Sequence, residues 1–219
     1  MKLFLDSADY KKIAPYAHMG MIDGVTINPS LLKVHAEPPV QIVREMIKQL
    51  PEGEICLQVT EMEPEKMYAQ AHKIAAIADN MVVKIPCAQR YMSVISRLVQ
   101  DQVPVNVTLV FTLTQALQIA KLGVNYISLF VGRLEDNNVP GLEVAESVQD
   151  MLNAYDFDSE LLVASVRSLD HVIGALSFGA DAITIPLDIF AQLGESPLTT
   201  GGLVLFERDW ESGSHTDLV

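Results

Sequence analysis

The 219-residue chain is short of cysteine, of basic residues and of long apolar runs, and each shortage excludes a class of protein. Its two cysteines, Cys56 and Cys87, offer neither a metal-ligand spacing nor a disulfide framework. Lysine and arginine number 15 against 28 acidic residues, and the net charge of −13 argues against nucleic acid and anionic membranes as partners. No apolar run approaches the length that spans a bilayer, and the N-terminus, which reaches charge at Asp6, lacks a signal-peptide core. We therefore expect a soluble, cytoplasmic globular protein.

The chain also lacks linkers, low-complexity segments and a spacing of histidines typical of a metal site. We therefore expect a single domain over residues 1–219, no metal and no other cofactor. The histidines are interpreted as structural or surface residues: His18, His35, His72, His171 and His215. A hydrophobic content of 49% is consistent with a parallel sheet covered on both faces.

Eight strand-like runs alternate with helix-like segments along the chain. The expected strands are 3–5, 24–28, 55–60, 81–85, 103–108, 125–129, 161–164 and 181–185, with a long loop at Val131–Gly141. Pro197 begins a last helix, expected over about 197–210, and a loose polar tail is expected over 211–219. Strict alternation of this kind predicts an α/β fold, a (β/α)8 TIM barrel with an extra C-terminal helix. A doubly wound open sheet is the alternative, but no Gly-rich phosphate fingerprint follows the first strand.

Lys84 stands near the end of the apolar strand Met81–Pro86 and has two interpretations. Burial among apolar neighbours disfavours the ammonium, and a neutral amine is a nucleophile towards carbonyls. The alternative is a lysine that snorkels from the strand end to solvent.

Polar residues occur at the carboxyl ends of nearly all the other strands, where the active sites of such barrels lie. They are Asp6, Asn28, Gln58, Asn106 with Thr108, Ser128 to Arg133, and Ser165 with Arg167. Packing alone does not explain so many polar groups at one mouth, so we interpret them as a site.

Each of these residues also has a structural alternative. Asp6 is either a general base or acid facing a carbonyl substrate or the cap of the first helix, and Asn28 before Pro29 suits a turn. Gln58 and Thr108 either satisfy each other or jointly hold a water. Ser165 either caps a turn or binds a substrate hydroxyl. The two arginines, Arg133 and Arg167, are either solvated or bind a phosphate.

Six motifs in this order resemble those of the transaldolase family, closest to its small members, which include the fructose-6-phosphate aldolases. They are Leu5-Asp6, Gly24–Ser30, Val82–Pro86, Asn106–Phe111, Val131–Asp136 and Ala164–Arg167, and the resemblance runs from residue 2 to about residue 210. It implies a (β/α)8 barrel with Schiff-base chemistry and no metal.

By this resemblance Lys84 is the Schiff-base lysine and Asp6 takes the proton from the C4 hydroxyl of a ketose phosphate. Asn28, Asn106 and Ser165 would then bind hydroxyls of the dihydroxyacetone unit, and Arg133 with Arg167 would bind the distal phosphate. Thr26 and Ser128 match pocket positions of the family.

Two positions point to different subfamilies. Phe130 resembles transaldolases, whereas the aldolases carry tyrosine there. Gln58 resembles the aldolases, whereas transaldolases carry a glutamate that can relay a proton through the catalytic water; an amide, as here, can only orient that water. The set of Asn106, Thr108 and Ser165–Arg167 favours the interpretation from Phe130.

The resemblance therefore predicts a transaldolase of the pentose phosphate pathway that moves a dihydroxyacetone unit from sedoheptulose 7-phosphate or fructose 6-phosphate to an aldose phosphate. The alternatives are a fructose-6-phosphate aldolase that releases dihydroxyacetone and, more remotely, a non-catalytic barrel that binds sugar phosphates. Small family members form pentamers and decamers through C-terminal helices. Apolar residues of the last helix, namely Leu203, Val204, Leu205, Phe206 and Trp210, suit such a homo-oligomer but could equally pack on their own barrel.

Overall fold

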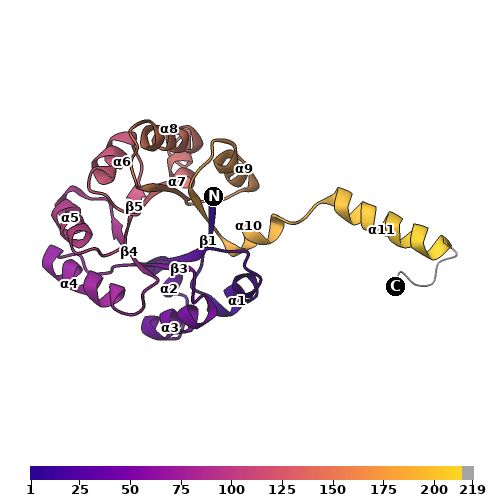
Figure 1. Cartoon of the computed structure of the whole chain (residues 1–219), viewed down its shortest axis with the longest axis horizontal. Helices are drawn as coiled ribbons and strands as arrows, with labels where there is room; N and C mark the ends of the chain where they lie inside the picture. Colours follow the sequence, from indigo (N-terminus) through magenta and orange to yellow (C-terminus); the bar gives the residue numbers. More distant parts are fainter. Residues whose placement is uncertain (214–219) are drawn as a thin grey trace.

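The computed structural model describes residues 1–213 and contains a closed barrel of eight parallel strands inside a ring of helices (Figure 1). The strands are β1 (Lys2–Asp6), β2 (Gly24–Ile27), β3 (Glu54–Gln58), β4 (Met81–Pro86), β5 (Val105–Val110), β6 (Tyr126–Phe130), β7 (Glu160–Ala164) and β8 (Ala182–Ile185). Each pairs with its neighbours in chain order, and β1 pairs with β8. The predicted (β/α)8 barrel is thus confirmed, and the doubly wound open sheet is wrong.

Helices follow every strand. They are α1 (Tyr10–His18), α2 (Pro29–Leu32), α3 (Pro39–Gln49), α4 (Pro64–Ala75), α5 (Met92–Gln100, after the 3-10 turn Gln89–Tyr91), α6 (Leu113–Ala120), α7 (Val131–Glu135), α8 (Gly141–Ala154), α9 (Leu169–Ser177), α10 (Leu187–Gln192) and α11 (Pro197–Ser212). The apolar faces of the longer helices pack on the barrel, as Ile42, Val43 and Met46 of α3 do.

Strand ends lie within two residues of the expected ones, but the structure differs from the expected elements at three other places. The segment Val131–Gly141, expected to be a loop, begins with the five-residue helix α7. A further short helix that was not expected, α2, directly follows Asn28, whose side chain caps it. The last helix reaches Ser212, so Glu211 and Ser212 are not part of a loose tail; the remainder of the expected tail, and with it His215, lies outside the described residues except for Gly213.

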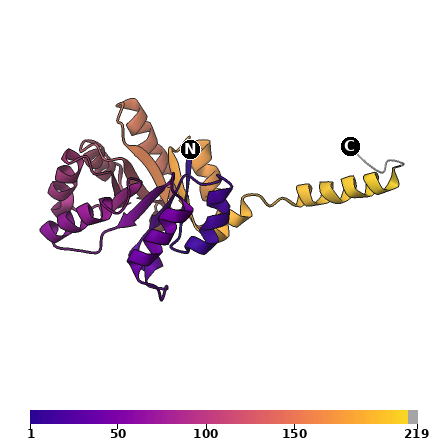
Figure 2. The same ribbon diagram turned by 60° about the horizontal axis from the view of Figure 1, so that its bottom comes forward.

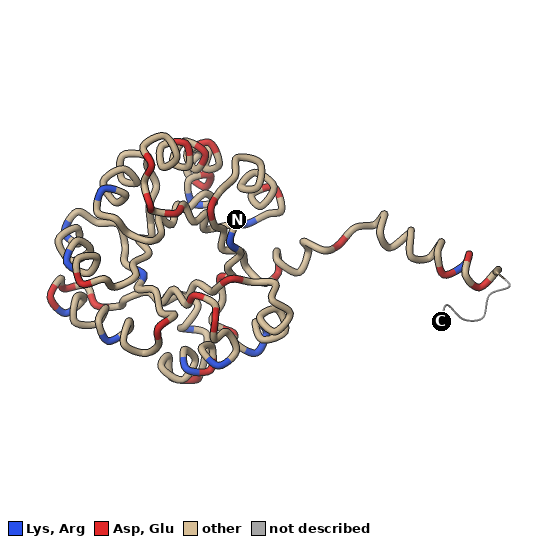
Figure 3. Tube along the Cα trace, viewed as in Figure 1, with Lys and Arg blue, Asp and Glu red and all other residues tan. Residues whose placement is uncertain are grey.

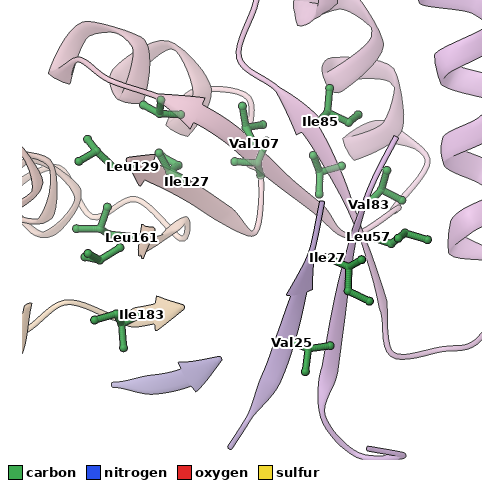
Figure 4. Packing of buried hydrophobic residues seen from close by; sticks show 14 of the residues in the cluster. Val25, Ile27, Leu57, Val83, Ile85, Val107, Ile127, Leu129, Leu161 and Ile183 are labelled. Atoms are coloured by element: carbon green, nitrogen blue, oxygen red, sulfur yellow. The ribbon is translucent and has the colours of Figure 1, made fainter. Parts of the chain in front are cut away.

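Strand residues alternate between the helix layer and the barrel interior, as the pleat requires. Odd-numbered residues such as Val25, Ile27 and Val83 face the helices and form the main core (Figure 4). Even-numbered residues face the barrel interior, and seven of them form a second cluster: Phe4, Cys56, Val82, Tyr126, Leu162, Ala164 and Ala182. Gly24 is required here, because a Cβ atom would lie 2.4 Å from the ring of Phe4.

The helix α11 stands away from the barrel at the end of an extended segment (Figures 1 and 2). Charged residues lie mainly on the outer helices and loops, with few on the strands around the barrel axis (Figure 3). Within residues 1–213, no helix combines the length and the apolar character needed to cross a membrane.

Candidate active site

A cavity of about 240 Å³ opens at the carboxyl ends of the strands. Its walls come from all eight strands or from the loops and helices that directly follow them. The lining residues are Asp6, Asn28, Pro29, Ser30, Gln58, Lys84, Leu109, Phe130, Arg133, Ala164, Ser165 and Thr184. Seven predicted site residues are therefore brought together, namely Asp6, Asn28, Gln58, Lys84, Phe130, Arg133 and Ser165.

Lys84 lies at the floor of this cavity and is only 2% exposed, so it does not snorkel to bulk solvent. In the barrel it pairs with Gln58 on one side and Asn106 on the other. Burial lowers the pKa of Lys84, although the nearby Asp6 and Cys56 oppose this shift. None of the ion pairs formed within residues 1–213 involves Lys84. The side chain therefore has the environment of a nucleophilic amine.

Asp6 ends β1 and does not cap the first helix, since Asp9 does so by accepting a hydrogen bond from the Lys12 amide. Its Oδ1 atom instead accepts a hydrogen bond of 2.7 Å from the Thr26 hydroxyl. Thr26 is fully buried and lies 2.8 Å from the hydroxyl of Thr184, on β8. This arrangement holds one carboxylate oxygen and leaves Oδ2 for a ligand.

A second set of buried polar groups lies on β5 and β6, beside Lys84. The Ser128 hydroxyl donates to Asn106 Oδ1 at 2.6 Å, and both residues are fully buried. Asn106 Nδ2 and Thr108 Oγ1 have no hydrogen-bond partner within residues 1–213. Because unpaired buried polar atoms are costly, these two atoms suit a bound water or a substrate hydroxyl. The alternative in which Gln58 and Thr108 satisfy each other is wrong.

Two residues of the cavity wall have left-handed backbone conformations, which are strained for residues other than glycine. Leu109 has a φ of 59° and lies in an irregularity where β5 shifts its register against β6. Ser165 has a φ of 61°. Ser165 does not cap the following helix, because Ser168 does. Strain of this kind is a feature of functional sites.

Arg133 and Phe130 form the wall on the side of α7. The guanidinium of Arg133 lies 5.1 Å from the centre of the Phe130 ring, a cation–π arrangement, and the cation faces the cavity. Arg167 does not line the cavity: it makes a bidentate ion pair with Asp136, which raises the pKa of the guanidinium and lowers the pKa of the carboxylate. Only one of the two predicted phosphate-binding arginines thus faces the cavity.

His171 connects α7 to the loop that carries Arg167. Its Nδ1 atom accepts a hydrogen bond from the Arg167 amide at 3.1 Å, and its Nε2 atom lies 2.7 Å from Glu135. An Nδ1 that accepts and an Nε2 that donates describe the neutral imidazole. His171 is buried, and these two contacts link Glu135 to the loop that carries Arg167. Within residues 1–213, no group of three or more histidine, cysteine, aspartate or glutamate side chains could hold a metal ion.

The remaining predicted residues lie outside the lining but close to it. Thr26, Asn106, Thr108 and Ser128 are fully buried on β2, β5 and β6. The cavity also contains two polar residues for which the sequence predicted no role, Ser30 and Thr184. Thr184 is the last even-numbered residue of β8, so the inward alternation along the strands could have identified it.

Comparisons with known proteins identify the family of this chain. A sequence profile of the family described as transaldolase/fructose-6-phosphate aldolase matches residues 3–216. A protein of Methanococcus maripaludis strain C5 named "Probable transaldolase" is 39% identical over 217 residues, which cover 99% of this chain and 100% of that protein. A protein of Aquifex aeolicus with the same name is 39% identical over 96% of this chain and 97% of its own length. One from Caulobacter vibrioides is 40% identical over 97% of each chain.

Among solved structures, a mandelate oxidase mutant with an FMN monooxide adduct superimposes with a TM-score of 0.61. The match covers 92% of this chain and 68% of that chain at 15% identity. A likeness at this identity shows the barrel fold alone.

Proposed function

Because this chain belongs to the transaldolase/fructose-6-phosphate aldolase family of aldolase-type enzymes, we propose that it transfers a dihydroxyacetone unit between sugar phosphates through a Schiff base on Lys84. The donor is a ketose phosphate, sedoheptulose 7-phosphate or fructose 6-phosphate, and the acceptor is an aldose phosphate. The burial of Lys84 at the cavity floor, with its lowered pKa, is the observation that carries the proposal.

The reaction begins when the neutral Lys84 amine attacks the C2 carbonyl of the donor. Loss of water from the carbinolamine gives an iminium, which withdraws electrons from the C3–C4 bond. Asp6 Oδ2 then takes the proton of the C4 hydroxyl while that bond breaks, and the shorter aldose phosphate leaves. The electron pair of the broken bond remains on nitrogen and C3 as an enamine.

The second half reverses these steps on a different aldehyde. C3 of the enamine attacks the acceptor carbonyl, the new hydroxyl recovers the proton from Asp6, and water hydrolyses the iminium to release the product and Lys84. The side chains of Asn28, Asn106 and Ser165 bind hydroxyls of the three-carbon unit. Asn28 Oδ1 already accepts the Leu31 amide, which leaves the Nδ2 donor for this purpose.

Water has a defined place in this scheme. Thr108 Oγ1, which is buried without a partner within residues 1–213, and the Gln58 amide hold the water that is released when the iminium forms and the water that later hydrolyses it. Gln58 orients this water and cannot take its proton, so proton transfer falls to Asp6.

The substrate phosphate binds to Arg133, the cavity arginine. Arg167 lies outside the cavity lining, where Asp136 holds its guanidinium in place. It adds a second positive charge on the same side as the bound phosphate. The protein works on these small molecules in the cytoplasm, within the pentose phosphate pathway, as a homo-oligomer.

A fructose-6-phosphate aldolase is the second candidate, and Gln58 favours it. If water protonates C3 of the enamine before an acceptor arrives, the enamine becomes an iminium, and hydrolysis of this iminium releases free dihydroxyacetone and Lys84. Phe130 argues for transfer, because it brings an apolar ring to the wall where a phenol could position that water.

The deciding measurement is product formation from fructose 6-phosphate, with and without erythrose 4-phosphate. We expect glyceraldehyde 3-phosphate to form only with the acceptor. Comparable formation without it, accompanied by free dihydroxyacetone, would establish the aldolase instead. If no product forms in either case, the remaining interpretation is a non-catalytic barrel that binds sugar phosphates.

Borohydride trapping tests the nucleophile itself. Reduction in the presence of fructose 6-phosphate should add the mass of a dihydroxyacetone adduct to the peptide that contains Lys84. Lys84→Met should lose the adduct and reduce turnover by at least roughly a thousandfold. Lys11→Met, which removes an exposed lysine, is the matched control and should behave as the wild type. Unchanged turnover in Lys84→Met contradicts the Schiff base.

A further inference from the structure

Thr184 is a cavity residue to which the proposed reaction gives no part. It is the third residue of β8, is 2% exposed, and lines the same cavity as Asp6 and Lys84. Its hydroxyl lies 2.8 Å from the Thr26 hydroxyl, which in turn lies 2.7 Å from Asp6 Oδ1. Three side chains from three neighbouring strands, β8, β2 and β1, therefore form one continuous hydrogen-bonded chain.

The direction of this chain follows from counting hydrogens. An ionised carboxylate only accepts, so the single hydroxyl hydrogen of Thr26 is directed to Asp6. Thr26 can then only accept from Thr184, whose hydrogen is directed to Thr26. Each hydroxyl has a single defined orientation as long as Asp6 is ionised.

We infer that Thr184 is a positioning residue, which orients Asp6 through Thr26 for proton abstraction from the substrate. The inference rests on the proposed role of Asp6 as the proton acceptor. Thr184 need not touch the reacting atoms, and no proton moves along the chain.

The geometry explains why such a device is useful. Asp6 ends its strand and is partly exposed to the cavity, so its carboxylate could rotate about χ2, a torsion that packing alone restrains poorly. The bond to Thr26 occupies Oδ1 and thereby directs Oδ2 to the substrate hydroxyl. Thr26 would be a weaker and less directed donor without a donor of its own, because hydrogen bonds in a chain polarise one another.

Two substitutions separate the hydroxyl of Thr184 from its methyl group. Thr184→Val keeps the branched shape and removes the hydroxyl, whereas Thr184→Ser keeps the hydroxyl and removes the methyl. If the residue only fills space in the barrel, serine is the more damaging substitution. If it positions Asp6, valine is.

We expect Thr184→Val to lower kcat for dihydroxyacetone transfer by about tenfold, with KM changed by less than about twofold, since misdirection of a catalytic group affects the chemical step. Thr184→Ser should recover most of this loss. Thr26→Val, which removes the direct donor to Asp6, should lower kcat by about a hundredfold. Borohydride trapping on Lys84 should persist in all three variants. The matched control is Thr114→Val. Its hydroxyl lies 3.1 Å from the Thr112 hydroxyl on the outer surface, and the loss of this contact should leave kcat unchanged.

A second readout needs no substrate. In carbon-13 NMR at one fixed pH, the Asp6 carboxyl resonance, identified by its absence from Asp6→Asn, should move in Thr26→Val and, by less, in Thr184→Val. The difference follows because Thr26→Val removes the hydrogen bond to Asp6 Oδ1, whereas Thr184→Val removes only the donor that supports this bond. Thr184→Ser should keep the wild-type resonance.

These outcomes separate a failure of the proposed function from a failure of the inference about Thr184. A wild type that transfers nothing refutes the proposed function, while the Asp6 carboxyl resonance still decides whether Thr184 acts on Asp6. An active wild type with Thr184→Val equal to it in kcat and in the Asp6 resonance overturns the inference and leaves the function intact. Greater loss in Thr184→Ser than in Thr184→Val also overturns it, in favour of packing.

Discussion

The burial of Lys84 lowers the stability of the folded protein and at the same time makes the amine more reactive. Its ammonium is disfavoured by burial, so the pKa of the folded protein lies below the value of about 10.4 that an unfolded chain has. Between these two pKa values the unfolded chain binds more protons, and the free energy of unfolding of the wild type therefore rises with pH. Below the folded pKa, the charged lysine is buried at full cost.

We accordingly expect Lys84→Met to raise the free energy of unfolding at pH 7 by about 1 kcal/mol or more, although it abolishes turnover. The gain should shrink as the pH rises towards about 10, because the wild type regains stability there and methionine has no proton to lose. Urea unfolding at pH 7 and pH 9.5 measures both effects. Lys11→Met is the control for an exposed lysine and should change stability by less than about 0.5 kcal/mol. A variant no more stable than the wild type at pH 7 would contradict this account.

At the same scale, the sequence locates strand-end residues well and their partners poorly. Asp6, Gln58 and Lys84 reach the cavity because parallel strands end at one face, which alternation alone predicts. The ion pair between Arg167 and Asp136 joins residues that are 31 positions apart in the sequence, and no spacing in the sequence predicts it. Thr184 was missed although its inward register placed it beside Thr26.

Among the elements, α7 is the helix for which the sequence predicts a loop. It has only five residues, too few for a helical period to show, and it is followed by the turn-forming Asn137 and Asn138. The contacts that stabilise it are tertiary: a Cβ atom at Gly132 would lie 2.3 Å from the Ser165 carbonyl oxygen. Only glycine lets α7 approach β7 so closely. The same helix carries Arg133 to the cavity.

Gly132→Ala should therefore disturb both the fold and the phosphate side of the site. We expect the free energy of unfolding to fall by about 1–3 kcal/mol, because a backbone carbonyl cannot yield as a side chain does. We expect KM for fructose 6-phosphate to rise about tenfold, with a smaller effect on kcat, since a displaced Arg133 weakens binding of the phosphate in ground and transition state alike. Thermal unfolding and steady-state kinetics measure the two effects.

Gly194→Ala is the matched control for that substitution. Gly194 lies between α10 and α11, and a Cβ atom there has open space within 4 Å. It should leave stability and KM close to the wild type. An unchanged KM in Gly132→Ala would mean that α7 does not set phosphate affinity.

Over the whole molecule, the two ends of the barrel have different tasks. The amino-terminal end is closed by a network in which Tyr126 Oη accepts from Lys2 Nζ at 2.6 Å and donates to Glu54 at 2.5 Å, while Lys2 also pairs with Glu160 at 2.9 Å. Above it, Phe4 and the other apolar residues of the inner cluster fill the interior. The unpaired polar atoms of Asn106 and Thr108 and the strained cavity residues Leu109 and Ser165 lie towards the other end. Stability and chemistry are thus separated along one axis.

The helix α11 belongs to neither end of the barrel, because it stands away from it (Figures 1 and 2). Every residue of α11 is exposed apart from Gly202, which is half-buried, and Leu198 and Phe206 are 87% and 74% exposed. A helix of 16 residues with two adjacent glycines is marginal in water unless its apolar side is covered. We therefore predict that a second copy of the chain covers it and that the protein is a homo-oligomer, a pentamer or decamer by its resemblance to small family members.

Light scattering tests this prediction on the intact protein and on a chain that ends at residue 196. We expect the intact protein to be oligomeric and the shortened chain, which retains the whole barrel, to have the mass of a smaller assembly or a monomer. Phe206→Glu should weaken the assembly within the full chain, because it places a charge on a surface that association would desolvate. Its neighbour Glu207 supplies the matched control, Glu207→Gln, which should leave the mass unchanged. If the shortened chain keeps the mass expected for the same number of copies, α11 is not the contact between subunits.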